Sequence, residues 1–159
     1  MTMQSSAAPV RTRTVVEAPI NRAFEVFTRE MKSWWPSDHH ILDGEVAEMI
    51  FEPRLGGRIY DRGTDGQECT WARVLAYEPP DRVVFSWDIS PQWVTETDLE
   101  RTSEVEVRFI AETQSRTRVE LEHRGLERHG GGWEGMYGAV SSDGGWPKTL
   151  AAFAARLAA

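Results

Sequence analysis

Short segments in which apolar and polar residues strictly alternate restrict the fold of this chain more than any other feature of its sequence. Residues 82–89 (RVVFSWDI), 103–111 (SEVEVRFIA) and 116–123 (RTRVELEH) each place apolar side chains at every second position. In the last two segments, charged residues occupy most of the positions between them. A period of two with charges on one side is typical of an antiparallel sheet that has one face in water.

Other short segments, bounded by Gly, Pro or Asp, extend this sheet. We expect further strands at residues 10–18, 46–52, 57–62 and 68–77. The TDG at 64–66 is typical of a tight hairpin turn. With the alternating segments, this makes a sheet of about seven strands, which is enough to twist and curl. The sequence therefore predicts a sheet with a concave face.

The last stretch of the chain, GGWPKTLAAFAARLAA at 144–159, predicts a long C-terminal helix. Pro147 is tolerated in a first helical turn, and no later residue breaks the helix. One face of this helix is shared by the apolar residues Trp146, Leu150, Phe153 and Leu157. Two short helices are expected after the first strand, at 20–27 and 31–36. The predicted fold is therefore α+β, with a curved antiparallel sheet wrapped on the C-terminal helix.

Length, charge and cysteine content narrow the classes of protein to consider. We interpret residues 1–9 as a disordered polar tail without the apolar core of a secretory signal, and 10–159 as a single domain. The net charge of −7 and the lack of a basic run argue against nucleic acid as a partner. No apolar run approaches the ~20 residues of a membrane span, so no membrane insertion is expected. A lone cysteine, Cys69, indicates a cytoplasmic protein.

Sequence motifs for cofactors or metals are not found. The chain has no Walker loop, dinucleotide fingerprint or GxSxG elbow, so we expect no cofactor. His39 and His40 adjoin Asp38, but no further ligand stands at a spacing that would complete a zinc site. We interpret this segment as a surface loop and predict no metal site. Cys69 has no histidine close in sequence and is expected to be an inert thiol.

Several motifs, taken in order, resemble one known superfamily. They are APINRAFEVF at 18–27, WWP at 34–36, EPRLGGRIYDR at 52–62, RVLAYEPPDRVVFSW at 73–87, VELEHRGLERHG at 119–130 and GGWPKTLAAF at 144–153. Their order and spacing resemble the START-related ligand-binding superfamily (SRPBCC), with its helix-grip fold. Within it, the chain looks like the bacterial single-domain branch of the activators of the 90-kDa heat-shock protein ATPase. The resemblance implies a pocket between the C-terminal helix and the sheet.

The strand and helix faces predict which side chains would line such a pocket. The lining is expected to be mostly apolar, with aromatic walls, and to consist of Trp35, Met49, Phe51, Ile59, Phe85, Trp87, Val107, Phe109, Leu121, His123, Trp146, Leu150 and Phe153. A cavity of this kind suits a hydrophobic or aromatic ligand. The alternative is a fully packed core with no void, which the pattern of residues does not distinguish from a pocket.

Two ionisable residues are weak candidates for catalysis. His123 continues the alternation of its strand and should point inward, where a histidine can act as acid or base. A lone inward histidine is more often a core residue whose hydrogen bonds are satisfied. Asp61 should also point inward if Ile59 does, and Tyr60 or Tyr137 could complete an acid–base pair.

Three functions follow as hypotheses. The first is a non-enzymatic protein that binds a small hydrophobic molecule under the C-terminal helix. The second is an enzyme of the cyclase, aromatase or hydrolase kind that uses His123 with Asp61 or a tyrosine. The third, implied only by the name of the resembling family, is a co-chaperone-like protein that contacts a 90-kDa chaperone. An exposed edge strand could also pair two chains into a homodimer.

Overall fold

A computed structural model describes residues 7–158 of the chain. Within this range the strands are β1 (Val10–Val16), β2 (Val46–Phe51), β3 (Arg58–Gly63), β4 (Glu68–Glu78), β5 (Arg82–Trp87), β6 (Ser103–Thr113) and β7 (Arg116–Arg124). The α-helices are α1 (Ile20–Thr28), α2 (Trp133–Ser141) and α3 (Trp146–Ala158). Short 3₁₀ turns occur at η1 (Met31–Ser33), η2 (Leu99–Arg101) and η3 (Leu126–His129).

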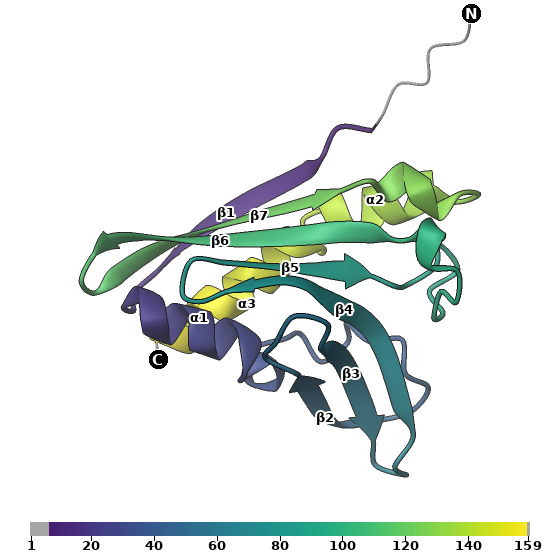
Figure 1. The fold of residues 1–159 in the computed structure, drawn as a ribbon, viewed down its shortest axis with the longest axis horizontal. Coiled ribbons are helices and arrows are strands. Elements are labelled where there is room, and N and C mark those ends of the chain that lie inside the picture. Colours follow the sequence, from purple (N-terminus) through teal and green to yellow (C-terminus); the bar gives the residue numbers. More distant parts are fainter. Residues whose placement is uncertain (1–6, 159) are drawn as a thin grey trace, which may run out of the picture.

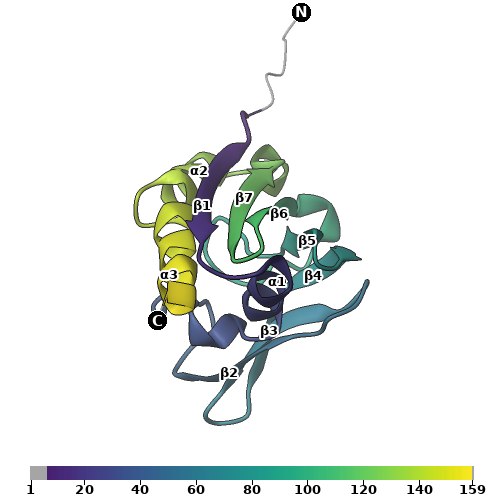
Figure 2. The same ribbon diagram turned by 90° about the vertical axis from the view of Figure 1, so that its left-hand side faces the viewer.

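The strands form one antiparallel sheet in the order β1-β7-β6-β5-β4-β3-β2 (Figure 1). Viewed from its end, the sheet is an arc that is open on one side, and α3 lies across the opening (Figure 2). Helix α1 lies inside the same arc near one end of the sheet. This arrangement confirms the predicted α+β helix-grip fold, with its curved sheet of seven strands and its C-terminal helix.

Helix α3 has the predicted amphipathic character. Trp146, Leu150 and Phe153 are at most 3% exposed on the side that faces the sheet. The preceding turn needs glycine, since a Cβ atom at Gly145 would clash with the backbone carbonyls of α2. At 13 residues α3 is short for a membrane span, and no helix within residues 7–158 is both long and apolar enough to cross a bilayer.

Aromatic side chains fill the half of the concave face that lies under α1. Phe27 is fully buried, and its ring centroid lies 4.9 Å from Trp34, 5.6 Å from Phe109 and 5.2 Å from Phe153. The contacts with Phe109 and Phe153 are edge to face, and such contacts add to the free energy gained by burying the rings. The core is therefore closely packed at this end, and any open space must lie toward the other end of α3.

A charged cluster covers the outer face of the sheet. Glu106 on β6 accepts hydrogen bonds from Arg82, Arg108 and Arg124 at 2.6, 2.7 and 2.6 Å. Burial alone would raise the pKa of Glu106, but these guanidinium groups outweigh it and lower the pKa to about 2. The outer face is thus polar, as the alternation predicted, and its ion pairs tie β5, β6 and β7 together.

A tryptophan-lined cavity as candidate functional site

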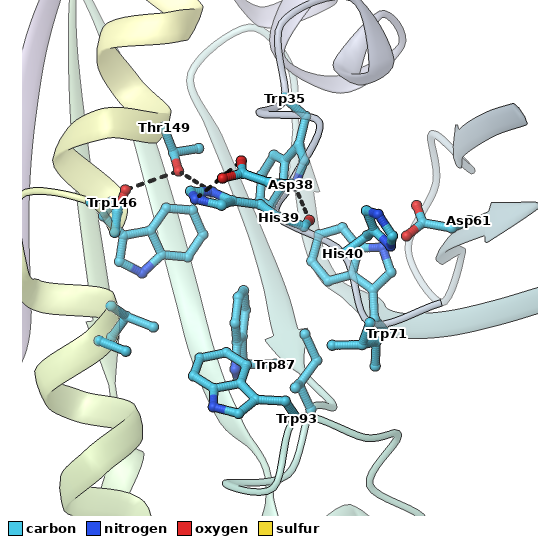
Figure 3. A pocket seen from close by; sticks show the side chains of 16 residues that line it. Trp35, Asp38, His39, His40, Asp61, Trp71, Trp87, Trp93, Trp146 and Thr149 are labelled. Atoms are coloured by element: carbon cyan, nitrogen blue, oxygen red, sulfur yellow. Dashed lines mark hydrogen bonds and ion pairs between the residues drawn. The ribbon is translucent and has the colours of Figure 1, made fainter. Parts of the chain in front are cut away.

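A cavity of about 500 Å³ opens between the sheet and the N-terminal end of α3. Its walls come from the loop after η1, from β3, β4 and β5, from the segment that follows β5, and from the turn between α2 and α3 (Figure 3). The lining residues are Trp35, Asp38, His39, His40, Ile41, Asp61, Trp71, Trp87, Ile89, Trp93, Ala139, Val140, Gly144, Gly145, Trp146 and Thr149. Its volume lies within the range typical of small-molecule sites.

Four indole rings contact one another in a closed cycle and form an aromatic wall of this cavity. The centroid distances are 5.3 Å from Trp35 to Trp71, 5.9 Å from Trp71 to Trp87, 5.5 Å from Trp87 to Trp146 and 5.9 Å from Trp146 back to Trp35. Trp93 adds a fifth indole at the rim, where it is 43% exposed. Rigid aromatic walls of this kind offer flat faces against which an aromatic ligand can stack.

The local backbone explains why these indoles converge. Strands β3 and β4 pair Ile59 with Ala72 and Tyr60 with Thr70, which leaves Trp71 as the extra residue of a bulge. A bulge breaks the period of two and redirects a side chain. Sequence alternation therefore could not assign Trp71 to the concave face, although the residue forms a central part of the cavity wall.

Asp61 is the most buried carboxylate in the cavity wall. It lies on β3 on the same face as Ile59, as predicted, and is 2% exposed. Burial raises its pKa to about 6, although an interaction with the indole of Trp71 works in the opposite direction. Within residues 7–158 its Oδ1 atom has no hydrogen-bond partner. A carboxyl that titrates near neutral pH and has a free acceptor atom can exchange protons with a ligand.

The loop that carries His39 and His40 folds over the cavity. The Nδ1 atom of His39 lies 3.4 Å from the hydroxyl of Thr149 on α3, and burial lowers the pKa of His39. The Nδ1 atom of His40 lies 3.0 Å from the carbonyl oxygen of Leu42. We interpreted this segment only as a surface loop, whereas both histidines line the cavity. Within the described residues no group of three or more potential ligands could hold a metal ion.

His123 lies behind the cavity wall and not in it. The indole N–H of Trp146 donates to its Nδ1 atom at 3.0 Å, so the proton of the neutral imidazole is on Nε2. That Nε2 atom lies 2.8 Å from Ser103 Oγ, which is 2.7 Å from His129 Nε2. Burial, together with the neighbouring His129, lowers the pKa of His123 to about 3. The residue is buried as predicted, and its neutral ring positions Trp146.

The other residues predicted for the pocket divide between the cavity and the packed core. Trp35, Trp87 and Trp146 line the cavity. The remaining apolar residues lie outside its lining, and they are Met49, Phe51, Ile59, Phe85, Val107, Phe109, Leu121, Leu150 and Phe153. They face inward as predicted, but Phe27 and its aromatic neighbours fill the space that they enclose. The cavity is therefore confined to one end of the predicted pocket.

The other predicted acid–base partners do not reach the cavity. Arg58 covers the ring of Tyr60, with its guanidinium carbon 4.2 Å from the ring centroid, and Tyr137 meets Trp133 edge to face. Neither tyrosine belongs to the lining. Figure 3 shows Asp61 and Trp146 on opposite sides of the cavity, and His123 lies behind Trp146. Asp61 and His123 therefore do not form the expected pair in this structure.

The curved seven-stranded sheet, the C-terminal helix across its concave face and the cavity between them define a helix-grip protein of the SRPBCC type. Residues 17–158 match the family described as "Activator of Hsp90 ATPase homolog 1-like protein", and the chain belongs to that family. This agrees with the resemblance seen in the sequence motifs. No curated protein sequence matches the chain.

Solved structures of similar proteins cover nearly the whole chain. An anthrahydroquino-γ-pyrone synthase, Txn09, is 39% identical, with a TM-score of 0.68 over 97% of this chain and 99% of that one. CalC, a self-sacrificing resistance protein from Micromonospora echinospora, is 27% identical, with a TM-score of 0.66 over 94% and 93%. Protein MLL2253 from Mesorhizobium loti is 18% identical, with a TM-score of 0.65 over 95% and 97%, and shows the fold alone.

Proposed function

We propose that this protein binds a flat aromatic small molecule in the cavity between α3 and the sheet. The observation that carries the proposal is the wall of four mutually contacting indoles that borders a space of about 500 Å³. A fused-ring ligand can stack on several of these faces at once, and each buried ring contact adds to hydrophobic binding. Binding of hydrophobic ligands is common among proteins with this fold.

The name of one similar protein supports this choice of ligand. Anthrahydroquino-γ-pyrone, the compound in the name of Txn09, contains fused aromatic rings, and that protein shares 39% of its residues with this chain. The two chains also cover one another almost completely. We therefore place polycyclic aromatic compounds of polyketide type ahead of fatty acids, flavonoids and sterols as ligands to test.

A ligand screen with a cavity-blocking variant tests the proposal. A ligand present at 100 times its Kd should stabilise the protein by about 2.7 kcal/mol, which a melting-temperature screen detects. Ala139 lines the cavity from α2, so Ala139→Trp should abolish the shift by filling the space. Ala151 is exposed on α3 outside the lining, so Ala151→Trp should keep it. A screen without any shift, or equal shifts in both variants, would contradict binding at this site.

A second candidate function is general acid–base catalysis on the bound aromatic molecule. The specific observation is Asp61, because its buried carboxyl faces the cavity and its pKa of about 6 suits proton transfer near neutral pH. His123 is not needed in this scheme. The reactions that fit are cyclisations in which a proton leaves one atom of the ligand and is returned to another.

A probe reaction can reveal an accessible base in the cavity. In 5-nitrobenzisoxazole a base removes the proton from C3, the N–O bond breaks, and the product is a coloured cyanophenolate. We expect the wild-type rate to rise with pH through about 6 as Asp61 ionises. Asp61→Asn should lower the rate about 100-fold or more, whereas Asp38→Asn, at another lining carboxylate, should not. Equal rates in wild type and Asp61→Asn would exclude Asp61 as the base.

The remaining hypotheses stay predictions. The family name suggests contact with a 90-kDa chaperone, which the ATPase rate of such a chaperone would reveal in the presence of this protein. Strand β2 is at one edge of the sheet and could pair with a second copy, which light scattering would detect as a dimer. A cytoplasmic location is predicted from the lone Cys69.

A further inference from the structure

We propose that the Asp61 end of the cavity binds a hydroxyl group of the aromatic ligand, so that the protein prefers phenols and hydroquinones to ring systems that carry only carbonyl oxygens. The inference deepens the proposed function and rests on it, because it assigns a polar subsite within the same cavity. It derives from the hydrogen-bonding groups that two lining residues leave unused.

The first unused group is the Oδ1 atom of Asp61. The side chain lies in the cavity wall, and this atom has no hydrogen-bond partner within residues 7–158. A buried acceptor without a donor costs free energy, which a donor on a ligand would recover. Rotation about the terminal torsion of an aspartate is soft, so either carboxyl oxygen can turn toward the cavity.

The second unused group is the Nε2 atom of His40. Figure 3 shows His40 beside Asp61, and both residues line the cavity. The other ring nitrogen, Nδ1, lies 3.0 Å from the carbonyl oxygen of Leu42. A carbonyl oxygen only accepts, so Nδ1 carries the proton, and in the neutral ring Nε2 must then be an acceptor.

Two acceptors, the buried carboxyl of Asp61 and the Nε2 atom of the exposed His40, therefore lie at this end of the cavity. At this end the indole of Trp71 already interacts with the Asp61 carboxyl, and Lys32 does not line the cavity. The lining also holds a donor without a partner within residues 7–158, the indole N–H of Trp87, but Figure 3 shows Trp87 on the far side of Trp71 from Asp61. A ligand hydroxyl can donate to either acceptor, whereas a carbonyl oxygen would oppose their lone pairs. Leaving the buried acceptor unpaired should weaken binding by about tenfold to 100-fold.

A pair of matched ligands and three variants test this subsite. The probes are 2,6-dihydroxyanthraquinone and 9,10-anthraquinone, whose affinities are measured by quenching of tryptophan fluorescence at pH 7. The wild-type protein should bind the dihydroxy compound at least about tenfold more tightly. Asp61→Leu should reduce this preference to about threefold or less, and Asp61→Asn should reduce it in part. Asp43→Asn, at an exposed carboxylate outside the lining, should leave it unchanged.

The outcomes separate the inference from the proposed function. Equal affinity of both probes for the wild-type protein would overturn the hydroxyl preference while leaving aromatic binding intact. A preference that survives in both Asp61 variants, or that Asp43→Asn also removes, would overturn the assignment to Asp61. If neither probe quenches the fluorescence, the proposed aromatic binding and the hydroxyl subsite both fail. If Asp61→Leu does not fold, the test rests on Asp61→Asn alone. An unchanged preference for the dihydroxy compound in that variant would contradict the inference.

Discussion

Asp61→Asn should stabilise the folded protein, and the gain in the free energy of unfolding should be larger at pH 8 than at pH 4 by as much as about 3 kcal/mol. The reason is the carboxyl itself, which is 2% exposed in the cavity wall. Ionising a buried carboxyl without a full set of donors is unfavourable. An amide of the same shape carries no charge and so avoids this cost.

The direction of the pH dependence follows from the two pKa values. Burial raises the pKa of Asp61 from 3.8 to about 6 in the folded protein. Between these values the folded state binds more protons than the unfolded state, so stability falls as the pH rises through this window. The difference of about two pKa units, at 1.36 kcal/mol each, sets the expected size. The effects of Lys32 and His40 on the carboxylate are already contained in the pKa of about 6, so they need no separate contribution.

Urea unfolding of both proteins between pH 4 and pH 8 measures this effect. Asp38→Asn is the matched control, since Asp38 lines the same cavity but is 70% exposed. The free energy of unfolding of Asp38→Asn, plotted against pH, should run parallel to that of the wild type. Parallel profiles for wild type and Asp61→Asn would mean that the carboxyl is well solvated, which would remove the argument for Asp61 as an acid–base group.

A stabilising Asp61→Asn variant would also bear on function. Residues that lower stability tend to persist where a binding or catalytic site requires them. Asp61 combines a free acceptor atom, a raised pKa and a place in the cavity wall. The same substitution is expected to weaken binding of the hydroxylated probe. A gain in stability combined with a loss of binding is the signature of a residue kept for its ligand.

Sequence patterns predicted the sheet and its faces well, because period-two alternation reports directly on burial. Val107, Phe109 and Leu121 are at most 3% exposed, as their positions in alternating segments predicted. The same patterns could not locate the cavity, since a void depends on how far side chains from other elements reach. Phe27 on α1 and Phe153 on α3 meet at 5.2 Å and close the space that the strand pattern alone left open.

The lining residues that the sequence did not reveal lie where local periodicity fails. Trp71 is the extra residue of a bulge in β4, so no strand pattern assigns it to a face. His39 and His40 belong to a loop whose path is fixed by tertiary contacts, such as the one between His39 and Thr149 on α3. The only available signal was the high number of tryptophans, seven in the chain, of which five surround the cavity.

His123→Gln should remove a large part of the stability that the protein loses in acid. In the wild type, burial and His129 lower the pKa of His123 from 6.5 to about 3. Between these values the unfolded state binds more protons, so stability is lost as the pH falls. The loss attributable to this residue from pH 7 to pH 4 is about 3 kcal/mol. Glutamine does not titrate, and its amide can still accept from Trp146 and donate to Ser103.

The unfolding curves of the two proteins should therefore cross. At pH 7 the variant should be less stable by about 1–2 kcal/mol because the amide fits the two hydrogen bonds less well. At pH 4 it should be more stable than the wild type. His39→Gln is the control, since His39 is only partly buried and should change the acid response less. If His123→Gln loses stability in acid as steeply as the wild type, the acid-sensitive group is not His123.

The acid response of His123 should extend to the cavity. Protonation places a hydrogen on Nδ1, which then faces the indole N–H of Trp146 and can no longer accept from it. Trp146 is one of the four indoles of the aromatic wall, so losing its hydrogen bond should loosen the wall and weaken binding of aromatic ligands. Fluorescence quenching by 9,10-anthraquinone should therefore weaken as the pH falls toward about 3 in the wild type but not in His123→Gln. Equal weakening in both proteins would show that His123 does not couple acid to the cavity.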